Sequence, residues 1–231
     1  MAPQYPTRFD LNSQIARANR ATLDAAGVTA ISLVGPAGSG KTTLIETLLT
    51  RLNPKLRMAA IVGDLAAERQ VERMTRHGCR AIPLVTDNLA AINLREALGG
   101  LNLNELDLLL IESEDNAHSP VEFDLGHHLR ASVFSVAGGD DKATEYPFLI
   151  ARSDVVLLTK IDLLPSVKFD FKVFNQDVMR VKAKMPIIQL SLQSNQGIGQ
   201  WVQWVEAHLS PRVQQQRLAG TADPFIRIPN E

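Results

Sequence analysis

The sequence has one cysteine, no long hydrophobic run and almost no net charge. Cys79 is the only cysteine among 231 residues, so one chain forms neither an internal disulfide nor a four-cysteine zinc cluster. The N-terminus MAPQYPTRFD lacks the basic start and apolar core of a signal peptide, and no apolar run approaches the ~18 residues of a membrane span. We therefore expect a reducing, cytoplasmic setting and no membrane partner.

The charge and composition are those of an ordinary globular protein. The formal net charge is -1, with 45% hydrophobic and 21% charged residues, and the isoelectric point is about 6.5. A chain of this length supplies a sufficient core for one α/β domain. No overall field attracts it to nucleic acid or to an anionic membrane, so we expect no nucleic-acid partner.

Hydrophobic periodicity predicts a leading helix and then an alternation of strands and helices. Apolar residues recur at helical spacing from Asp10 to about Ala26, and Gly27 predicts the helix end. The predicted strands are TAISLVG, LRMAAIV, RAIPLV, LDLLLIE, ASVFSVA, SDVVLLTK and MPIIQLS. The predicted helices are 40–52, 67–77, 87–98, 143–152, 171–184 and 198–209. Strands this apolar are covered on both faces, so the pattern predicts an α/β fold with a mostly parallel sheet flanked by helices.

Three regions follow from this pattern. Residues 1–28 are a predicted N-terminal helical extension, and 29–209 are the predicted P-loop domain. Residues 210–231 lose periodicity and gain Gln and Pro, so we expect a flexible C-terminal tail.

The first strand runs into a phosphate-binding loop. Residues 35–42, GPAGSGKT, satisfy G-x-x-x-x-G-K-[ST] between a predicted strand and a predicted helix. The glycines let backbone N–H groups turn toward phosphates, and the helix N-terminus adds partial positive charge. Lys41 would reach the β- and γ-phosphates, and the Thr42 hydroxyl would ligate Mg²⁺. The predicted nucleotide ligands in this loop are Gly38, Ser39, Gly40, Lys41, Thr42 and Thr43.

A later strand carries a base-recognition pattern. Thr159-Lys160-Ile161-Asp162 is a form of [NT]-K-x-D, in which a carboxylate accepts from guanine N1–H and the exocyclic amine together. A further strand reaches Ser191 and Leu192, where a backbone N–H would meet guanine O6. The alternative for Asp162 is a helix N-cap. An ATP-dependent P-loop kinase, with His118, Glu122, Asp124 or His127 handling an acceptor hydroxyl, is the main rival.

Several longer segments resemble one family of GTPases. GPAGSGKTTL, VGDLAAERQVERM, DLLLIESEDNAHSPVEFDLG, AGGDDKATEYP and DVVLLTKIDLLP are similar to the hydrogenase-maturation GTPase HypB and, more distantly, to its urease-maturation relative. The resemblance covers about residues 15–209 and implies a cytoplasmic, nucleotide-linked homodimer that helps deliver nickel to a hydrogenase. It also implies that Asp64 lies on the first switch near Mg²⁺ and that Glu112 ends the Walker-B-like strand. The predicted catalytic residues are Lys41, Asp64 and Glu112, and the predicted Mg²⁺ ligands are Thr42 and Asp64.

The chain departs from that family where the family binds metal. The family's Cys-His pair falls on Ala90 and Ala91, and a further cysteine falls on Ser119. Alanine has no lone pair, and an alcohol is a poor ligand for Ni²⁺ or Zn²⁺, so we expect no nickel or zinc site. The remaining candidates, His77 with Cys79 and His127 with His128, are fragments of two ligands, and we interpret these histidines as exposed loop residues.

The parts that hydrolyse GTP are also altered. Ala67 and Gln70 stand where the family's first switch carries Thr and Asp, and Asp115 replaces a glycine of the second switch. Asp115 and Glu114 either place negative charge near the γ-phosphate or point into solvent on a loop. We therefore predict a GTPase that acts in metalloenzyme maturation and hydrolyses GTP slowly. The alternative is a non-catalytic GTP/GDP-dependent dimeric switch or scaffold for a maturation partner.

Overall fold

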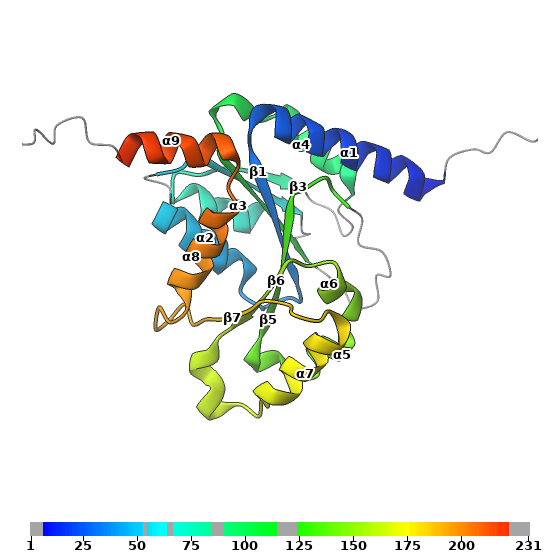
Figure 1. Ribbon diagram of the computed structural model, residues 1–231, viewed down its shortest axis with the longest axis vertical. Coiled ribbons are helices and arrows are strands. Elements are labelled where there is room, and N and C mark those ends of the chain that lie inside the picture. The colour runs from blue at the N-terminus through cyan, green and yellow to red at the C-terminus, as the bar shows by residue number, and fades with distance from the viewer. Residues whose placement is uncertain (1–6, 53–54, 64–66, 85–89, 115–123, 222–231) are drawn as a thin grey trace, which may run out of the picture.

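The computed structural model describes residues 7–52, 55–63, 67–84, 90–114 and 124–221 (Figure 1). Its strands are β1 (Thr29–Gly35), β2 (Met58–Gly63), β3 (Arg80–Leu84), β4 (Leu108–Glu114), β5 (Leu129–Ser135), β6 (Val155–Thr159) and β7 (Ile187–Gln189). They form one parallel seven-stranded sheet in the order β3-β2-β4-β1-β5-β6-β7. The predicted α/β fold with a parallel sheet is confirmed.

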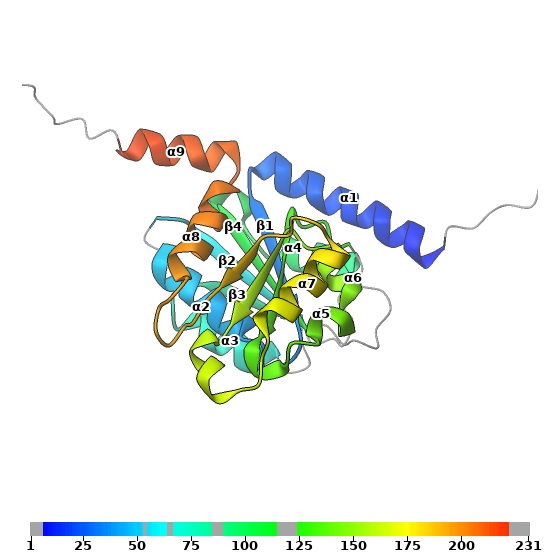
Figure 2. The same cartoon turned by 60° about the horizontal axis from the view of Figure 1, so that its bottom comes forward.

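Helices cover both faces of the sheet (Figure 2). They are α1 (Arg8–Ala26), α2 (Lys41–Leu52), α3 (Ala67–Thr75), α4 (Ala91–Gly99), α5 (Lys142–Glu145), α6 (Pro147–Ala151), α7 (Phe171–Val181), α8 (Ile198–Ala207) and α9 (Pro211–Thr221). Short 3-10 helices are η1 (Leu103–Glu105), η2 (Val136–Gly138) and η3 (Ile161–Ser166). None of the described helices is long and apolar enough to cross a membrane.

The core is divided by the sheet into three apolar clusters. On one face, side chains of α2 and α8 such as Leu48 and Trp201 pack on alternate residues of the central strands. On the other face, α1 and α4 cover one half through residues such as Leu23 and Leu94. Helices α5, α6 and α7 cover the remaining half, where Phe174 is fully buried. Because β4, β1, β5 and β6 are neighbours and run parallel, their C-terminal ends lie at one edge of the sheet, where parallel sheets bind ligands.

Two local predictions are wrong. The helix predicted at 143–152 is broken at Tyr146 (φ -118°, ψ 51°), since Pro147 begins α6 and disfavours helical geometry in the residue before it. The tail predicted to be flexible from 210 is helical over α9, because Val213 is buried in the core. Ser210 Oγ donates to Gly27 O at 2.5 Å and Arg212 donates to Leu106 O at 2.6 Å.

Candidate functional site

The phosphate loop lies between β1 and α2, as its motif predicts. Gly40 has φ +101°, a conformation that favours glycine. Lys41 is 6% exposed, and its Nζ donates to Gly35 O at 2.7 Å and to Pro36 O at 3.0 Å. The Ser39 side chain is buried, and its Oγ has no partner among the described residues. The loop thus presents an ammonium group, a buried hydroxyl and a helix N-terminus in one place, which is the donor set that a polyphosphate requires.

A carboxylate from β4 meets the first threonine of α2. Thr42 Oγ1 donates to Glu112 Oε1 at 2.6 Å, and Glu112 is 2% exposed. The parallel pairing of β1 with β4 brings them together by setting Leu33 opposite Glu112. Because the hydroxyl hydrogen points to the carboxylate, the oxygen lone pairs of Thr42 can ligate a cation. Asp64, the other residue predicted at Mg²⁺, lies outside the described residues.

Two residues of the predicted base-recognition pattern, Thr159 and Lys160, form hydrogen bonds to the phosphate loop. Thr159 Oγ1, at the end of β6, is 2.6 Å from Ser39 O and 3.1 Å from Phe134 O. Lys160 has φ +59°, and its Nζ donates to Gly38 O at 2.8 Å. These contacts place the predicted base-reading residues and the predicted phosphate ligands at one edge of the sheet.

Asp162 and the segment after β7 carry the remaining residues predicted to recognise the base. Asp162 lies within η3, whose N-cap is Lys160, so the alternative of a simple helix cap does not hold. Ser191 is fully buried, and its N–H donates to Gln196 O at 3.0 Å. Of the two residues predicted to offer an N–H to the base, the half-buried Leu192 is therefore the better candidate.

An arginine of α3 joins the site although the sequence analysis missed it. Arg73 donates through Nε and Nη2 to both carboxylate oxygens of Glu46 on α2, at 2.9 and 2.6 Å. Its Nη2 also lies 3.4 Å from Thr43 Oγ1. Arg73 and Glu46 are 27 positions apart in the sequence, and no local sequence pattern predicts that they form a pair.

The segment GDDK, residues 139–142, has structural partners. Asp140 Oδ2 accepts from Asp170 N at 2.8 Å, just before α7. Lys142 pairs with Glu145 and lies 6.0 Å from the ring centre of Tyr146, and the hydrogen bond from Lys142 to Glu145 raises the pKa of the ammonium. The Asp140 contact attaches the loop after β5 to the start of α7, and the contacts of Lys142 lie within α5 and with the residue that follows it.

The adjacent histidines occupy different environments, and the prediction that both are exposed is wrong. His128 accepts from Ala30 N at Nδ1 (2.9 Å) and lies 3.1 Å from Asp24 through Nε2. His127 is 7% exposed, and burial, followed by the positive charge of Arg130, lowers its pKa to about 3. Within the described ranges, no group of three His, Cys, Asp or Glu side chains has the geometry to hold a metal.

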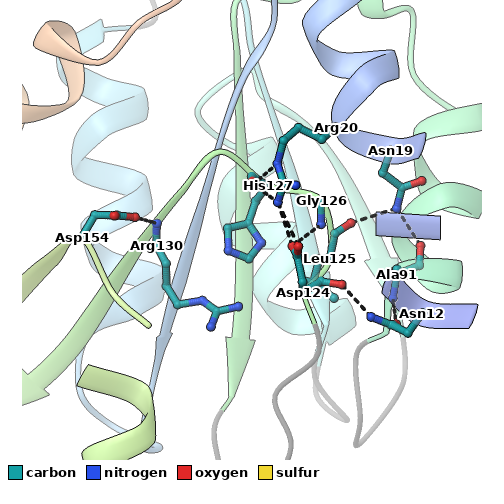
Figure 3. A network of polar contacts seen from close by, with 10 residues as sticks. All are labelled: Asn12, Asn19, Arg20, Ala91, Asp124, Leu125, Gly126, His127, Arg130 and Asp154. Carbon is teal, nitrogen blue, oxygen red and sulfur yellow. Dashed lines mark hydrogen bonds and ion pairs between the residues drawn. The ribbon is translucent and has the colours of Figure 1, made fainter. Parts of the chain in front are cut away.

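Ala90 and Ala91, the positions where the resemblance predicts that metal ligands are missing, have backbone contacts at the start of α4. Ala90 is the N-cap of α4, and Ala91 N donates to Asn12 Oδ1 at 2.9 Å (Figure 3). Neither alanine side chain offers a ligand atom. Ser119, Asp115, His118 and Glu122 lie outside the described residues.

The fold and the site define a P-loop nucleotide-binding protein, and comparison with known proteins places it in a family. The sequence profile of the CobW/HypB/UreG nucleotide-binding domain matches residues 29–189. The probable hydrogenase maturation factor HypB of Methanocaldococcus jannaschii is 38% identical over 198 residues, covering 84% of this chain and 90% of that protein. HypB of Escherichia coli K12 is 35% identical over 201 residues, covering 86% of this chain and 69% of that protein.

Solved structures agree with the sequence comparison. HypB from Archaeoglobus fulgidus superposes with a TM-score of 0.79 at 30% identity, covering 85% of this chain and 98% of that chain. HypB from Helicobacter pylori, solved in complex with nickel, has a TM-score of 0.80 at 23% identity, which supports the fold alone. The chain belongs to the HypB family, within the CobW/HypB/UreG nucleotide-binding proteins.

Proposed function

We propose that the protein is a Mg²⁺-dependent GTPase that acts in hydrogenase maturation, as its HypB relatives are named to do. The observation that carries the proposal is the bonding of Thr159 and Lys160 to the carbonyl groups of Ser39 and Gly38. It supports one site in which Asp162 accepts from guanine while the loop around Lys41 holds the phosphates. When bound, Mg²⁺ would neutralise phosphate charge, and Thr42, with Glu112 behind it, would hold the ion.

We further propose that hydrolysis is slow and that the domain does not use nickel or zinc. Ala67 and Gln70 lack the hydroxyl and carboxylate of the family's first switch. Ala90 and Ala91 cannot ligate a metal. A nucleotide-linked homodimer, a maturation protein as partner and a cytoplasmic location are part of this proposal, by similarity to the family.

The test is calorimetric titration of the full chain with GTP, GDP and ATP, each with and without Mg²⁺. We expect Mg²⁺-dependent GTP binding, and Asp162→Asn should weaken it by at least roughly 100-fold, since an amide cannot accept from both guanine donors. Preference for ATP would refute the guanine assignment and favour the kinase. Loss of Mg²⁺ dependence in Thr42→Val would support the cation site.

Three further measurements separate the remaining alternatives. Slow phosphate release over hours supports a GTPase, whereas GTP binding without release would identify a non-catalytic switch. Light scattering with GTP and with GDP tests the dimer. Stoichiometric Ni²⁺ or Zn²⁺ in the same calorimeter would overturn the argument from Ala90 and Ala91.

A further inference from the structure

The loop after β7, residues 190–197, is closed on itself by hydrogen bonds. Ser191 is fully buried, donates its N–H to Gln196 O at 3.0 Å and accepts from Ser194 N through Oγ at 3.1 Å. The side chain of Leu192 packs against the core cluster formed with α2 and α8. The N–H of Leu192 has no acceptor among the residues that the structure describes. The closed loop therefore presents one backbone donor that its own hydrogen bonds leave unused.

This loop is bonded to the segment that carries Asp162. Leu190 donates its N–H to Leu158 O, near the end of β6, at 2.9 Å. The carbonyl oxygen of Leu190 accepts from Ile161 N at 3.4 Å. Ile161 begins η3 and Asp162 follows it directly. The unused N–H of Leu192 and the Asp162 carboxylate thus belong to two segments joined to each other within the described residues.

Gly197 fixes the far end of the loop against β7. It has φ +72°, and a Cβ there would lie 2.0 Å from Gln189 O, a backbone atom of β7. Gly197 is also the N-cap of α8, and its carbonyl oxygen accepts at 3.2 Å from the N–H of the fully buried Trp201. Because a strand lies on one side and a buried helix on the other, only glycine lets the loop close here.

A side-chain hydrogen bond from α2 holds the outer part of the loop. Arg51, in the last turn of α2, donates through Nη2 to Asn195 Oδ1 at 3.1 Å. Asn195 has φ +60°, a conformation in which asparagine is enriched. The first residue of α2 is Lys41. One helix therefore begins at the predicted phosphate ligands and ends on the loop predicted to recognise the base.

A backbone N–H can discriminate between purines at the 6-position. Guanine carries a carbonyl oxygen there, which accepts a hydrogen bond, whereas adenine carries an amino group, which donates one. Two donors that face each other are both left unpaired, and this costs more than one missing hydrogen bond. The discrimination requires a loop that does not yield, since a site that is loose by about 1 Å loses much of its selectivity.

We propose that Gly197 and the bond between Arg51 and Asn195 are positioning elements that hold the N–H of Leu192 where the 6-oxo group of guanine binds. They set the selectivity of the site at the purine 6-position without touching the base. The proposal rests on the GTPase function proposed above, and it extends that function by assigning part of the base selectivity to residues outside the base-recognition pattern.

Three nucleoside diphosphates separate the loop from Asp162. Relative to GDP, 6-thio-GDP keeps both donors that Asp162 would accept from and replaces the oxygen by sulfur, a weak acceptor. Inosine diphosphate keeps the 6-oxo group and lacks the exocyclic amine. Calorimetry of the full chain with Mg²⁺ and each nucleotide measures the affinities. We expect the unmodified protein to bind GDP about 10-fold more tightly than 6-thio-GDP, near the upper limit for one neutral hydrogen bond.

Gly197→Ala is the decisive variant. It should lower the affinity for GDP and for inosine diphosphate alike by about 10-fold, and the affinity for 6-thio-GDP by less than about threefold. Gly199→Ala is the matched control, because a Cβ at this glycine of α8 meets nothing within 4 Å, and it should leave all three affinities unchanged. Asp162→Asn should instead lower the preference for GDP over inosine diphosphate.

Arg51→Ala keeps the proposal testable if Gly197→Ala does not fold. Arg51 and Asn195 are both exposed, so the fold does not depend on their bond. The preference for GDP over 6-thio-GDP should fall by about threefold, as expected for one exposed hydrogen bond. Arg95→Ala, at an exposed arginine of α4, is the control and should keep the preference of the unmodified protein.

The outcomes distinguish this proposal from the proposed function. A folded Gly197→Ala or Arg51→Ala protein that keeps the original preference for GDP over 6-thio-GDP overturns the role of the residue that was changed. An unmodified protein that binds GDP and 6-thio-GDP equally overturns the whole proposal, because no group then recognises the 6-oxo oxygen. An unmodified protein that binds no guanine nucleotide, or prefers ADP, overturns instead the GTPase function on which the proposal rests.

Discussion

His127 should make the protein lose stability in mildly acidic solution. Its pKa is lowered to about 3, first by burial and then by the charge of Arg130, whereas a histidine in an unfolded chain titrates near 6.5. Between these values the unfolded chain binds a proton that the folded protein does not. The stability is therefore fully present above about pH 6.5 and is lost as the pH falls toward 3.

The size of the effect follows from that difference. Each pH unit inside the window removes about 1.4 kcal/mol from the free energy of unfolding, so a fall from pH 7 to pH 5 removes about 2 kcal/mol. Asp107 and Asp124 do not interfere in this range. Burial opposes ionisation of both carboxyls, but hydrogen bonds from Arg57 and from Gly126 N–H outweigh it and lower their pKa, so their contribution is lost only below about pH 4.

Urea unfolding at pH 7, 6 and 5 measures this directly. The unmodified protein should lose about 2 kcal/mol between pH 7 and pH 5, and His127→Gln should lose much less, whatever its stability at pH 7. His77→Gln is the control, because His77 is exposed, and it should follow the unmodified protein. If His127→Gln keeps the full pH dependence, the buried neutral imidazole is not its cause and the reasoning fails.

Two further predictions concern the attachment of the terminal helices. Gly126→Ala should lower the free energy of unfolding by at least about 2 kcal/mol, because the added Cβ would clash with the α1 backbone. Gly99→Ala is the control: nothing lies near its Cβ position, so the free energy of unfolding should change by less than about 1 kcal/mol. Urea unfolding at pH 7 compares the two variants. Arg212→Ala should lower the free energy of unfolding by about 1–2 kcal/mol, because it removes hydrogen bonds to Leu106 O and Asp107. Gln215→Ala, at an exposed position of the same helix, should leave stability unchanged. Equal melting temperatures of the two variants would refute a stabilising role for the Arg212 guanidinium.

The sheet and the phosphate loop were predictable because each depends on a local pattern. A strand such as β1 is buried along its whole length and is therefore visible in the sequence as an apolar run. The glycine, lysine and threonine spacing from Gly35 to Thr42 likewise predicts the backbone conformation of the phosphate loop. The same holds for the segment from Thr159 to Asp162. Local chemistry of this kind is read from adjacent residues without knowing the rest of the fold.

The missed features depend on residues far apart in the chain. Asn12 and Asn19 look like ordinary polar residues of an exposed helix until residues 124–125, over 100 positions away, are placed against them. His127 and His128 are adjacent, yet only the fold shows that one ring is buried and the other bonds to Ala30 N. Burial of single polar residues is a tertiary property.

The position of β1 at the centre of the sheet has a consequence for synthesis of the chain. Leu108, the partner of Thr29 on β4, follows it by about 80 residues, and the other neighbour, β5, comes later still. At about 5–20 residues per second, the ribosome releases β1 roughly 4–16 s before either neighbouring strand exists. A nascent chain of this protein therefore carries an apolar, unpaired strand for seconds. Chaperones that recognise exposed apolar segments should bind it during that interval.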